Sequence, residues 1–181
     1  LYEAKRYFPD LSNLSTPFFI IGIPGSLCLV DLCLRYIPED QDIVFVANGL
    51  SKWERKWVEK NLNFDSKIII KKLVEHADVI DFLFDCYQKP FGLLDYDCFV
   101  LNPNFLKKFN NLSEYTIANA LFVYHNNIIN LDTPATYILY LNTPLINKIK
   151  QRYHIDSKVI SYEKLPIVVK EKMSELGFDQ N

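Results

Sequence analysis

The chain has no marked excess of charge of either sign. Its 181 residues include 20 Lys and Arg against 22 Asp and Glu, which gives a formal net charge of −2. Proteins that bind DNA, RNA or anionic membranes usually gather positive charge on one face. We therefore predict no nucleic-acid partner and no polybasic membrane face.

The sequence also lacks the short motifs of several large enzyme classes. Neither G-x-x-x-x-G-K-[ST] nor G-x-G-x-x-G occurs, so a P-loop and a dinucleotide-binding fingerprint are excluded. There is no G-x-S-x-G elbow, and no cysteine lies in basic surroundings. A nucleophilic triad is therefore unsupported.

The cysteines show no spacing typical of metal clusters. Cys28, Cys33, Cys86 and Cys98 lie among apolar neighbours, without a C-x-x-C or Cys/His ligand pair. Such cysteines are usually buried free thiols, which persist in reducing compartments. The expected location is cytoplasmic, and a peripheral position at a membrane stays open.

One apolar stretch, PFFIIGIPGSLCLVDLCLRYI at residues 17–37, is long enough to span a bilayer. A Pro-Gly-Ser break divides it, and Asp31 and Arg35 charge its second half. We predict a buried strand, a loop and a buried helix here, and no transmembrane segment. No signal peptide is recognisable. Because the first residue is Leu1 and not Met, a trimmed terminus or a fragment of a larger protein stays open.

Strands and helices alternate along the first hundred residues. Apolar runs predict strands at residues 18–23, 43–47 and 68–70, and a fourth strand that begins with the apolar residues FGLL and carries Asp95 and Asp97. Helical patterns follow the first three, at about residues 27–37, 51–62 and 75–87. Because parallel strands need a crossover, usually a helix, this order predicts a Rossmann-like α/β fold, with a mostly parallel sheet flanked by helices. Two further strands and two helices predict a mixed second half, and the absence of repeats and linkers predicts one domain over 1–181.

Two of the predicted helices have recognisable beginnings. Ser51 and Glu54 have the spacing of a capping box. Thr143 is the expected cap of a later helix, with Pro144 at its first position. A last helix is expected over about residues 166–176.

The most informative segment is FGLLDYDCFVLNP, at residues 91–103. In an extended chain Asp95 and Asp97 point to one side and Tyr96 points to the other. Two ionised carboxylates in partly apolar surroundings repel by roughly a few kcal/mol at an effective dielectric near 20. A divalent cation, Mg²⁺ or Mn²⁺, offsets this repulsion and keeps coordination positions for phosphate oxygens.

The place of these aspartates also favours a binding site. Ligands of open α/β sheets bind outside the carboxyl ends of the strands, and the two acids follow a short apolar strand. We expect residues 23–26, 48–49 and 95–97 to border one cleft, because all three segments follow parallel strands. The alternative, that helix N-termini or basic side chains satisfy the acids, stays open.

This segment resembles the D-x-D signature of nucleotide-sugar glycosyltransferases with the GT-A fold. The β-α-β-α-β-α order before it is similar to the nucleotide-binding half of that family. The resemblance covers about residues 18–104, and residues 105–181 would form a short acceptor-side half. It implies transfer of a sugar from a nucleoside-diphosphate donor to a carbohydrate, lipid or protein acceptor, with Mn²⁺ or Mg²⁺ bridging the diphosphate.

The resemblance implies roles for individual residues near the nucleotide. Asp97 would be the more direct metal ligand, and Asp95 would lie nearer the ribose or the water shell of the metal. The nucleotide would lie beside the loop after the first strand, which contains Pro24, Gly25 and Ser26.

Further site residues are candidates without a motif of their own. Asn48 and Tyr96 are expected near the nucleotide. The family commonly adds a metal-ligating histidine and, in inverting members, a carboxylate base. His154 is the candidate ligand, with His125 as an alternative, and Asp132 is the candidate base. Each also fits an ordinary role, as a surface histidine or a turn residue.

Two other functions stay open. Haloacid-dehalogenase-like phosphatases also use D-x-D after an apolar strand. Their fold normally opens with that motif, whereas three β-α units precede it here. A non-catalytic or degenerate transferase-like α/β module would bind neither metal nor nucleotide.

Overall fold

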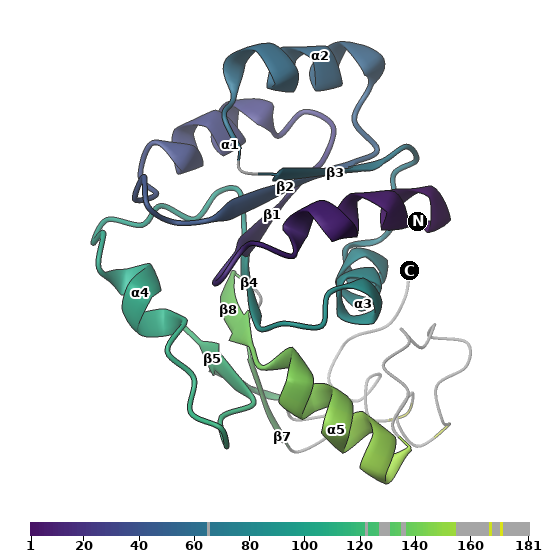
Figure 1. The fold of residues 1–181 in the computed structure, drawn as a ribbon, viewed down its shortest axis with the longest axis vertical. Coiled ribbons are helices and arrows are strands. Elements are labelled where there is room, and N and C mark those ends of the chain that lie inside the picture. Colours follow the sequence, from purple (N-terminus) through teal and green to yellow (C-terminus); the bar gives the residue numbers. More distant parts are fainter. Residues whose placement is uncertain are drawn as a thin grey trace.

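A computed structural model of the chain describes residues 1–64, 66–121, 123–126, 131–134 and 137–154, with the single positions 167 and 171 (Figure 1). For residues 8–10, 123–126 and 131–134 it describes the backbone alone. Apart from those two single positions, the helix expected over residues 166–176 lies outside the described residues.

A six-stranded sheet forms the centre of the molecule, in the order β3-β2-β1-β4-β8-β5. Its four parallel strands are β1 (Phe18–Gly22), β2 (Ile43–Asn48), β3 (Ser66–Ile70) and β4 (Phe91–Leu94). The second half of the chain adds β8 (Ile138–Leu141), antiparallel to β4, and β5 (Ala118–Ala120), antiparallel to β8. The predicted α/β fold with a mostly parallel sheet is confirmed.

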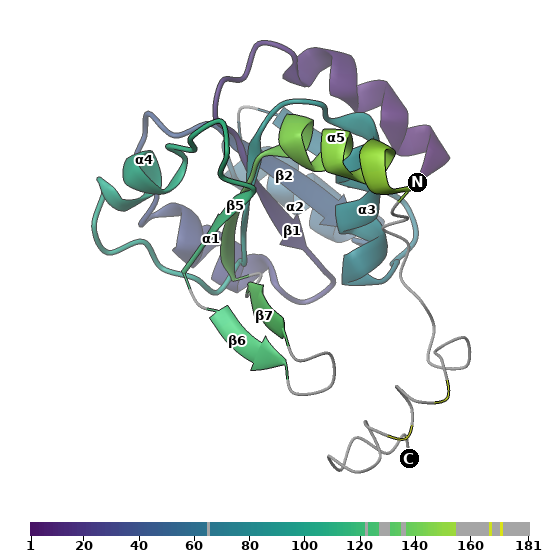
Figure 2. The same cartoon turned by 90° about the horizontal axis from the view of Figure 1, so that it is seen from below.

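Helices cover both faces of this sheet (Figures 1 and 2). One face packs against α1 (Leu27–Leu34), α2 (Lys52–Asn61) and α4 (Phe105–Phe109). The other packs against the 3-10 helix η1 (Tyr2–Leu11), α3 (His76–Cys86) and α5 (Thr143–Tyr153). Covered on both sides, the central strands β1, β2 and β4 are buried at every residue, which explains their continuous apolar sequences.

Two glycines allow aromatic rings of neighbouring strands to lie flat against the sheet. A Cβ atom on Gly22 would stand 2.4 Å from the ring of Phe45, and one on Gly92 would stand 2.2 Å from the ring of Phe18. Neither position has room for a side chain. These glycines therefore fix the close packing of β1 with β2 and β4.

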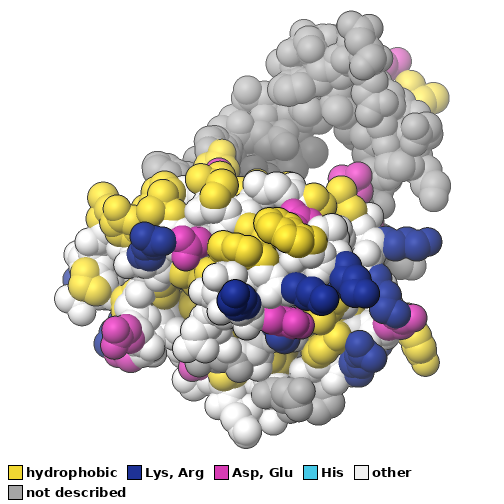
Figure 3. All heavy atoms as spheres, turned by 90° about the horizontal axis from the view of Figure 1, so that it is seen from above, with side chains coloured by type: hydrophobic (Ala, Val, Ile, Leu, Met, Phe, Trp, Pro, Cys, Tyr) yellow, Lys and Arg dark blue, Asp and Glu magenta, His cyan; other side chains and the backbone are white. Residues whose placement is uncertain are grey.

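The first helix is less buried than its sequence predicts. Leu27, Val30 and Cys33 are buried, but Leu29 and Leu32 are 38% and 39% exposed. Figure 3 looks onto the molecule from the side of α2 and shows apolar side chains at the surface among charged ones. The expectation of a helix buried all round is therefore wrong, because α1 packs on the sheet with only one face.

The helix caps confirm one prediction and correct another. Ser51 and Glu54 form the predicted capping box, with each side chain accepting from the backbone amide of the other residue. In α5 the cap is Asn142, whose side chain accepts from the amide of Leu145, and not Thr143. Thr143 is instead the first helical residue.

A separate hairpin lies in the second half of the chain. Strands β6 (Val123–Asn126) and β7 (Leu131–Pro134) form an antiparallel pair outside the main sheet (Figure 2). The described part of the second half thus contributes both to the central sheet and to this hairpin.

No helix within the described residues is long and apolar enough to cross a membrane.

Candidate functional site

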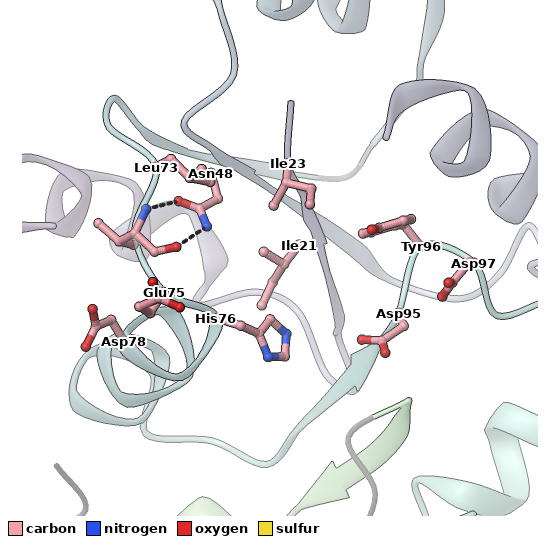
Figure 4. A pocket seen from close by; sticks show the side chains of 11 residues that line it. Ile21, Ile23, Asn48, Leu73, Glu75, His76, Asp78, Asp95, Tyr96 and Asp97 are labelled. Carbon is pink, nitrogen blue, oxygen red and sulfur yellow. Dashed lines mark hydrogen bonds between the residues drawn. The ribbon is translucent and has the colours of Figure 1, made fainter. Parts of the chain in front are cut away.

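A pocket of about 720 Å³ lies at the carboxyl edge of the parallel strands (Figure 4). Segments that follow β1, β2, β3 and β4 all contribute to its lining. Its apolar lining comes from Ile21, Ile23, Leu73 and Val74; its polar or aromatic lining is Asn48, Glu75, His76, Asp78, Asp95, Tyr96 and Asp97. The predicted cleft between the ends of parallel strands is therefore present.

The two aspartates lie in a turn that begins as β4 ends. The Cys98 amide donates to the Asp95 carbonyl at 3.0 Å, and the Asp95 amide donates to the carbonyl of Tyr137 at 2.9 Å. The chain is not extended here, so the predicted alternation of side chains is wrong. Tyr96 lines the same pocket as Asp95 and Asp97, and Figure 4 shows all three side chains at one wall.

The pKa of Asp95 reflects its partial burial and the charged side chains beside it. Asp95 is half-buried, and burial raises its pKa above the usual range. The charge of Asp97 raises the pKa of Asp95 further, while His76 lowers it. Ionised Asp95 is therefore disfavoured by its surroundings, and a cation beside it would relieve that cost.

Asn48 lines the pocket, but its amide group already has backbone partners. This side chain is 1% exposed and donates to the carbonyl of Val74 at 2.9 Å, while accepting from the Val74 amide at 3.1 Å (Figure 4). The two bonds fix the segment after β3 against the end of β2. Asn48 thus builds the pocket wall that leads into α3, and its contact with a nucleotide stays a prediction.

Beyond Ile23, the loop after β1 does not line the pocket. The Gly25 amide donates to Glu54 at 2.9 Å, and Gly25 adopts a positive φ of 85°. The Ser26 hydroxyl bonds with the amide and the carbonyl of Ile23. Pro24, Gly25 and Ser26 therefore stand apart from the aspartates, although Ile23 reaches the pocket. Their nucleotide contacts remain predictions.

Of the candidates in the second half of the chain, His154 is described and is not among the described residues that line the pocket. His154 is exposed and ends α5 with a left-handed φ of 53°. Asp132 lies in β7, where its backbone is paired with that of His125 in β6. The side chains of Asp132 and His125 are outside the described part of the structure, so their roles remain predictions.

Sequence reasoning missed the wall opposite the aspartates. Glu75, His76 and Asp78 lie at the start of α3 and line the pocket. In Figure 4 the imidazole of His76 points into the space between the two walls. A signal was available, because the residues that follow β3 meet the same sheet edge as those that follow β4.

The two aspartates are the candidate metal ligands of the pocket. Among the described side chains, no group of three or more His, Cys, Asp or Glu residues is placed to hold a metal ion. Asp95 and Asp97 nevertheless supply the hard oxygen donors that Mg²⁺ and Mn²⁺ prefer. Mg²⁺ is commonly held by one or two carboxylates together with substrate phosphates and water. The two acids therefore fit a metal that is completed by its substrate.

Solved structures and curated proteins resemble this chain. The structure of the glycosyltransferase GlyE from Streptococcus pneumoniae TIGR4 has a TM-score of 0.52 and 13% identity, and the likeness covers 93% of this chain and 44% of GlyE. The dTDP-dihydrostreptose--streptidine-6-phosphate dihydrostreptosyltransferase of Streptomyces griseus is 27% identical over 104 residues. That stretch covers 58% of this chain and 27% of the relative. The chain thus spans well under two thirds of either protein.

A family model covers most of the chain. The model of the StrH glycosyltransferase N-terminal domain matches residues 1–146, from η1 into α5. The match includes all six strands of the central sheet and every described residue of the pocket. The likeness to GlyE shows the fold, and the family model goes further: this chain belongs to the StrH glycosyltransferase N-terminal domain family.

Proposed function

We propose that this chain binds the nucleoside-diphosphate sugar of a glycosyltransferase reaction, with Mn²⁺ or Mg²⁺ held by Asp95 and Asp97. The observation that carries the proposal is the turn after β4, which brings both carboxylates to one wall of the pocket. The pocket lies where ligands of open α/β sheets bind. Family membership supports sugar transfer as the reaction.

The charge of the pocket supports the need for a metal. Four of its lining residues are Glu or Asp, one is His, and none of the described lining residues is Lys or Arg. A nucleoside diphosphate is itself anionic, so these walls would repel it. Divalent cations bridge anionic ligands to carboxylates in many phosphate-binding sites. Binding of the donor should therefore depend strictly on the cation.

The side chains that line the pocket would have different roles in binding. Asp95 and Asp97 would hold the metal, which supplies Lewis-acid stabilisation of the leaving diphosphate. Tyr96 lies between them and offers a ring face against which a base or sugar can pack. Ile21 and Ile23 form an apolar floor that excludes water from the bound donor. The division into a nucleotide-binding part (18–104) and an acceptor-side part (105–181) belongs to the same proposal.

The name of one relative indicates a first candidate donor. The name of the Streptomyces griseus relative specifies a dTDP-activated sugar. We therefore place dTDP first among the candidate nucleotides, followed by UDP, GDP, CDP and ADP. The acceptor would be a carbohydrate, lipid or protein, with Asp132 as candidate base and His154 as candidate further ligand.

Isothermal titration calorimetry tests this function. The five nucleoside diphosphates are titrated separately into the chain, once with excess Mn²⁺ and once with excess EDTA. We expect one nucleotide to bind with Mn²⁺ and not with EDTA. Equal binding in EDTA would refute the role of the carboxylates, because the metal would then be dispensable.

One observation favours a second function. The Gly25 amide in the loop after β1 already donates to Glu54 and is not free for a phosphate, as expected for a non-catalytic transferase-like module. In that case none of the five nucleotides binds in either condition. The same titrations therefore separate the two functions.

A further inference from the structure

The turn that carries the two aspartates rests on helix α1. Cys33 of this helix is 0% exposed, and its thiol donates to the carbonyl of Cys98 at 3.0 Å. The Asp95 carbonyl lies 3.9 Å from the same sulfur. Since the Cys98 amide donates to the Asp95 carbonyl, the thiol contacts both ends of the turn. A single buried side chain thus lies against the carbonyl groups at both ends of the turn.

The thiol of Cys33 is suited to act as a permanent donor. Its sulfur is fully buried, and its S–H group is already directed at the carbonyl of Cys98. A thiol that is inaccessible and already bonded in this way is poorly placed to act as a nucleophile. This chemistry fits a structural hydrogen bond better than a reactive or metal-binding thiol.

The turn has a second anchor on its other side. The Asp95 amide donates to the carbonyl of Tyr137, the residue that precedes β8. Without the thiol, the turn would remain attached at Asp95 but would lose its support at Cys98. Asp97, which lies between these two ends and is exposed, would then have more freedom than Asp95.

We propose that Cys33 is a positioning residue, which holds the turn in the shape that lets Asp95 and Asp97 bind one metal ion. The inference rests on the proposed function, because it assigns a metal to this turn. Residues that orient metal ligands typically change metal affinity by about 10- to 100-fold when they are replaced. Cys33 acts through the backbone and does not itself contact the ligand.

Three variants test the proposal. Cys33→Ala removes the donor, Cys33→Ser keeps a donor of similar size, and Cys28→Ala changes an exposed cysteine of the same helix. Binding of Mn²⁺ alone is followed by electron paramagnetic resonance of the free ion. We expect affinity about 10-fold lower in Cys33→Ala, largely restored in Cys33→Ser and unchanged in Cys28→Ala. Wild-type affinity in Cys33→Ala, or equal losses in the Ala and Ser variants, overturns the proposal.

A measurement without metal separates this inference from the proposed function. Hydrogen exchange of the Cys98 amide reports the bond that closes the turn. It should be about 10-fold faster in Cys33→Ala than in wild type, and near wild type in Cys33→Ser. If wild type binds no Mn²⁺, with or without a nucleoside diphosphate, the proposed function fails while the exchange rates still report on the turn. Unchanged exchange in Cys33→Ala overturns the role of Cys33 even if the metal binds.

Discussion

Two loops at the same edge of the sheet differ in whether their polar groups already have partners within the protein. In the loop after β1 the polar groups form hydrogen bonds within the protein. The Gly25 amide donates to Glu54 of α2, and the Ser26 hydroxyl bonds with the backbone amide and carbonyl of Ile23. The turn after β4 is held by hydrogen bonds of its backbone, and the carboxylates of Asp95 and Asp97 stay at the pocket.

The difference lies in which groups already have partners. A phosphate needs free amides or a cation, and the carboxylate of Glu54 occupies the amide that the first loop would offer. The second loop offers carboxylates, which require a cation before they attract a phosphate. Position at a sheet edge therefore does not by itself make a loop a binding loop.

The largest expected effect comes from the second loop. Asp97→Asn should lower Mn²⁺-dependent nucleotide affinity by at least about 100-fold, or about 2.8 kcal/mol, because a neutral amide is a poor ligand for a hard cation. Calorimetry with the nucleotide that wild type binds measures the loss. The fold should be retained, because Asp97 is exposed.

Asp78→Asn is the matched control for this change. It removes one charge from the opposite wall of the same pocket, and we expect less than about a threefold change in affinity. Equal losses in both variants would mean that overall pocket charge, and not the turn, governs binding.

The pocket wall between these loops should depend on Asn48. Asn48→Ala should lower the free energy of unfolding by about 2–3 kcal/mol, because the amide and carbonyl of Val74 lose their partners. Urea denaturation measures the change. Asn61→Ala, which removes an exposed bond to the carbonyl of Trp57, should cost less than about 1 kcal/mol. A loss for Asn48→Ala as small as this control would contradict the role given to its two bonds.

The first loop should be sensitive to pH through Glu54. Hydrogen bonds from the amides of Gly25 and Ser51, led by Gly25, hold the pKa of Glu54 below its usual range. Because the folded pKa is depressed, this stabilisation is fully present above the unfolded pKa, near 4.3. It is lost as the pH falls through the folded pKa.

Glu54→Gln should therefore lower the free energy of unfolding by about 1 kcal/mol at pH 7 and by nearly nothing close to pH 3. Urea denaturation at several pH values gives the comparison with wild type. Glu59→Gln, on the same helix and paired with Lys67 at the surface, should cost less than about 0.5 kcal/mol at pH 7. A Glu54→Gln deficit that persists unchanged at pH 3 would rule out the ionised carboxylate as its source.

The smallest effect is expected at Pro24. This residue is exposed and outside the pocket lining, so Pro24→Ala should leave nucleotide affinity within about twofold of wild type. The titrations used for Asp97 provide the measurement. A loss of about tenfold or more would place the first loop in contact with the nucleotide, as the sequence alone suggests.

The arrangement of strands and helices could be predicted because its signals are local. Apolar runs and helical periodicity mark β1 to β4 and the helices between them, and the capping box of Ser51 and Glu54 marks the start of α2. The aspartates were expected on the fourth strand itself, whereas they lie just after it, in a turn. Exposure was harder to predict, because the large apolar side chain of Trp53 in α2 is 71% exposed.

The site itself was only partly predictable. Asp95, Asp97, Tyr96 and Asn48 were expected near one cleft and do line it. His76 was missed, although it follows β3 and therefore meets the same sheet edge as the residues that follow β4. The turn conformation was missed as well, since an alternating apolar and acidic sequence fits a strand as well as a turn.

The sequence by itself determined the alternation of elements, because each strand and helix is encoded by residues next to one another. Only the tertiary structure decided which polar groups remain available to a ligand. Glu54 reaches Gly25 across 29 residues, Asn48 reaches Val74 across 26, and Cys33 reaches Cys98 across 65. Each of these bonds forms only after the sheet has brought distant segments together, so no local pattern reports it.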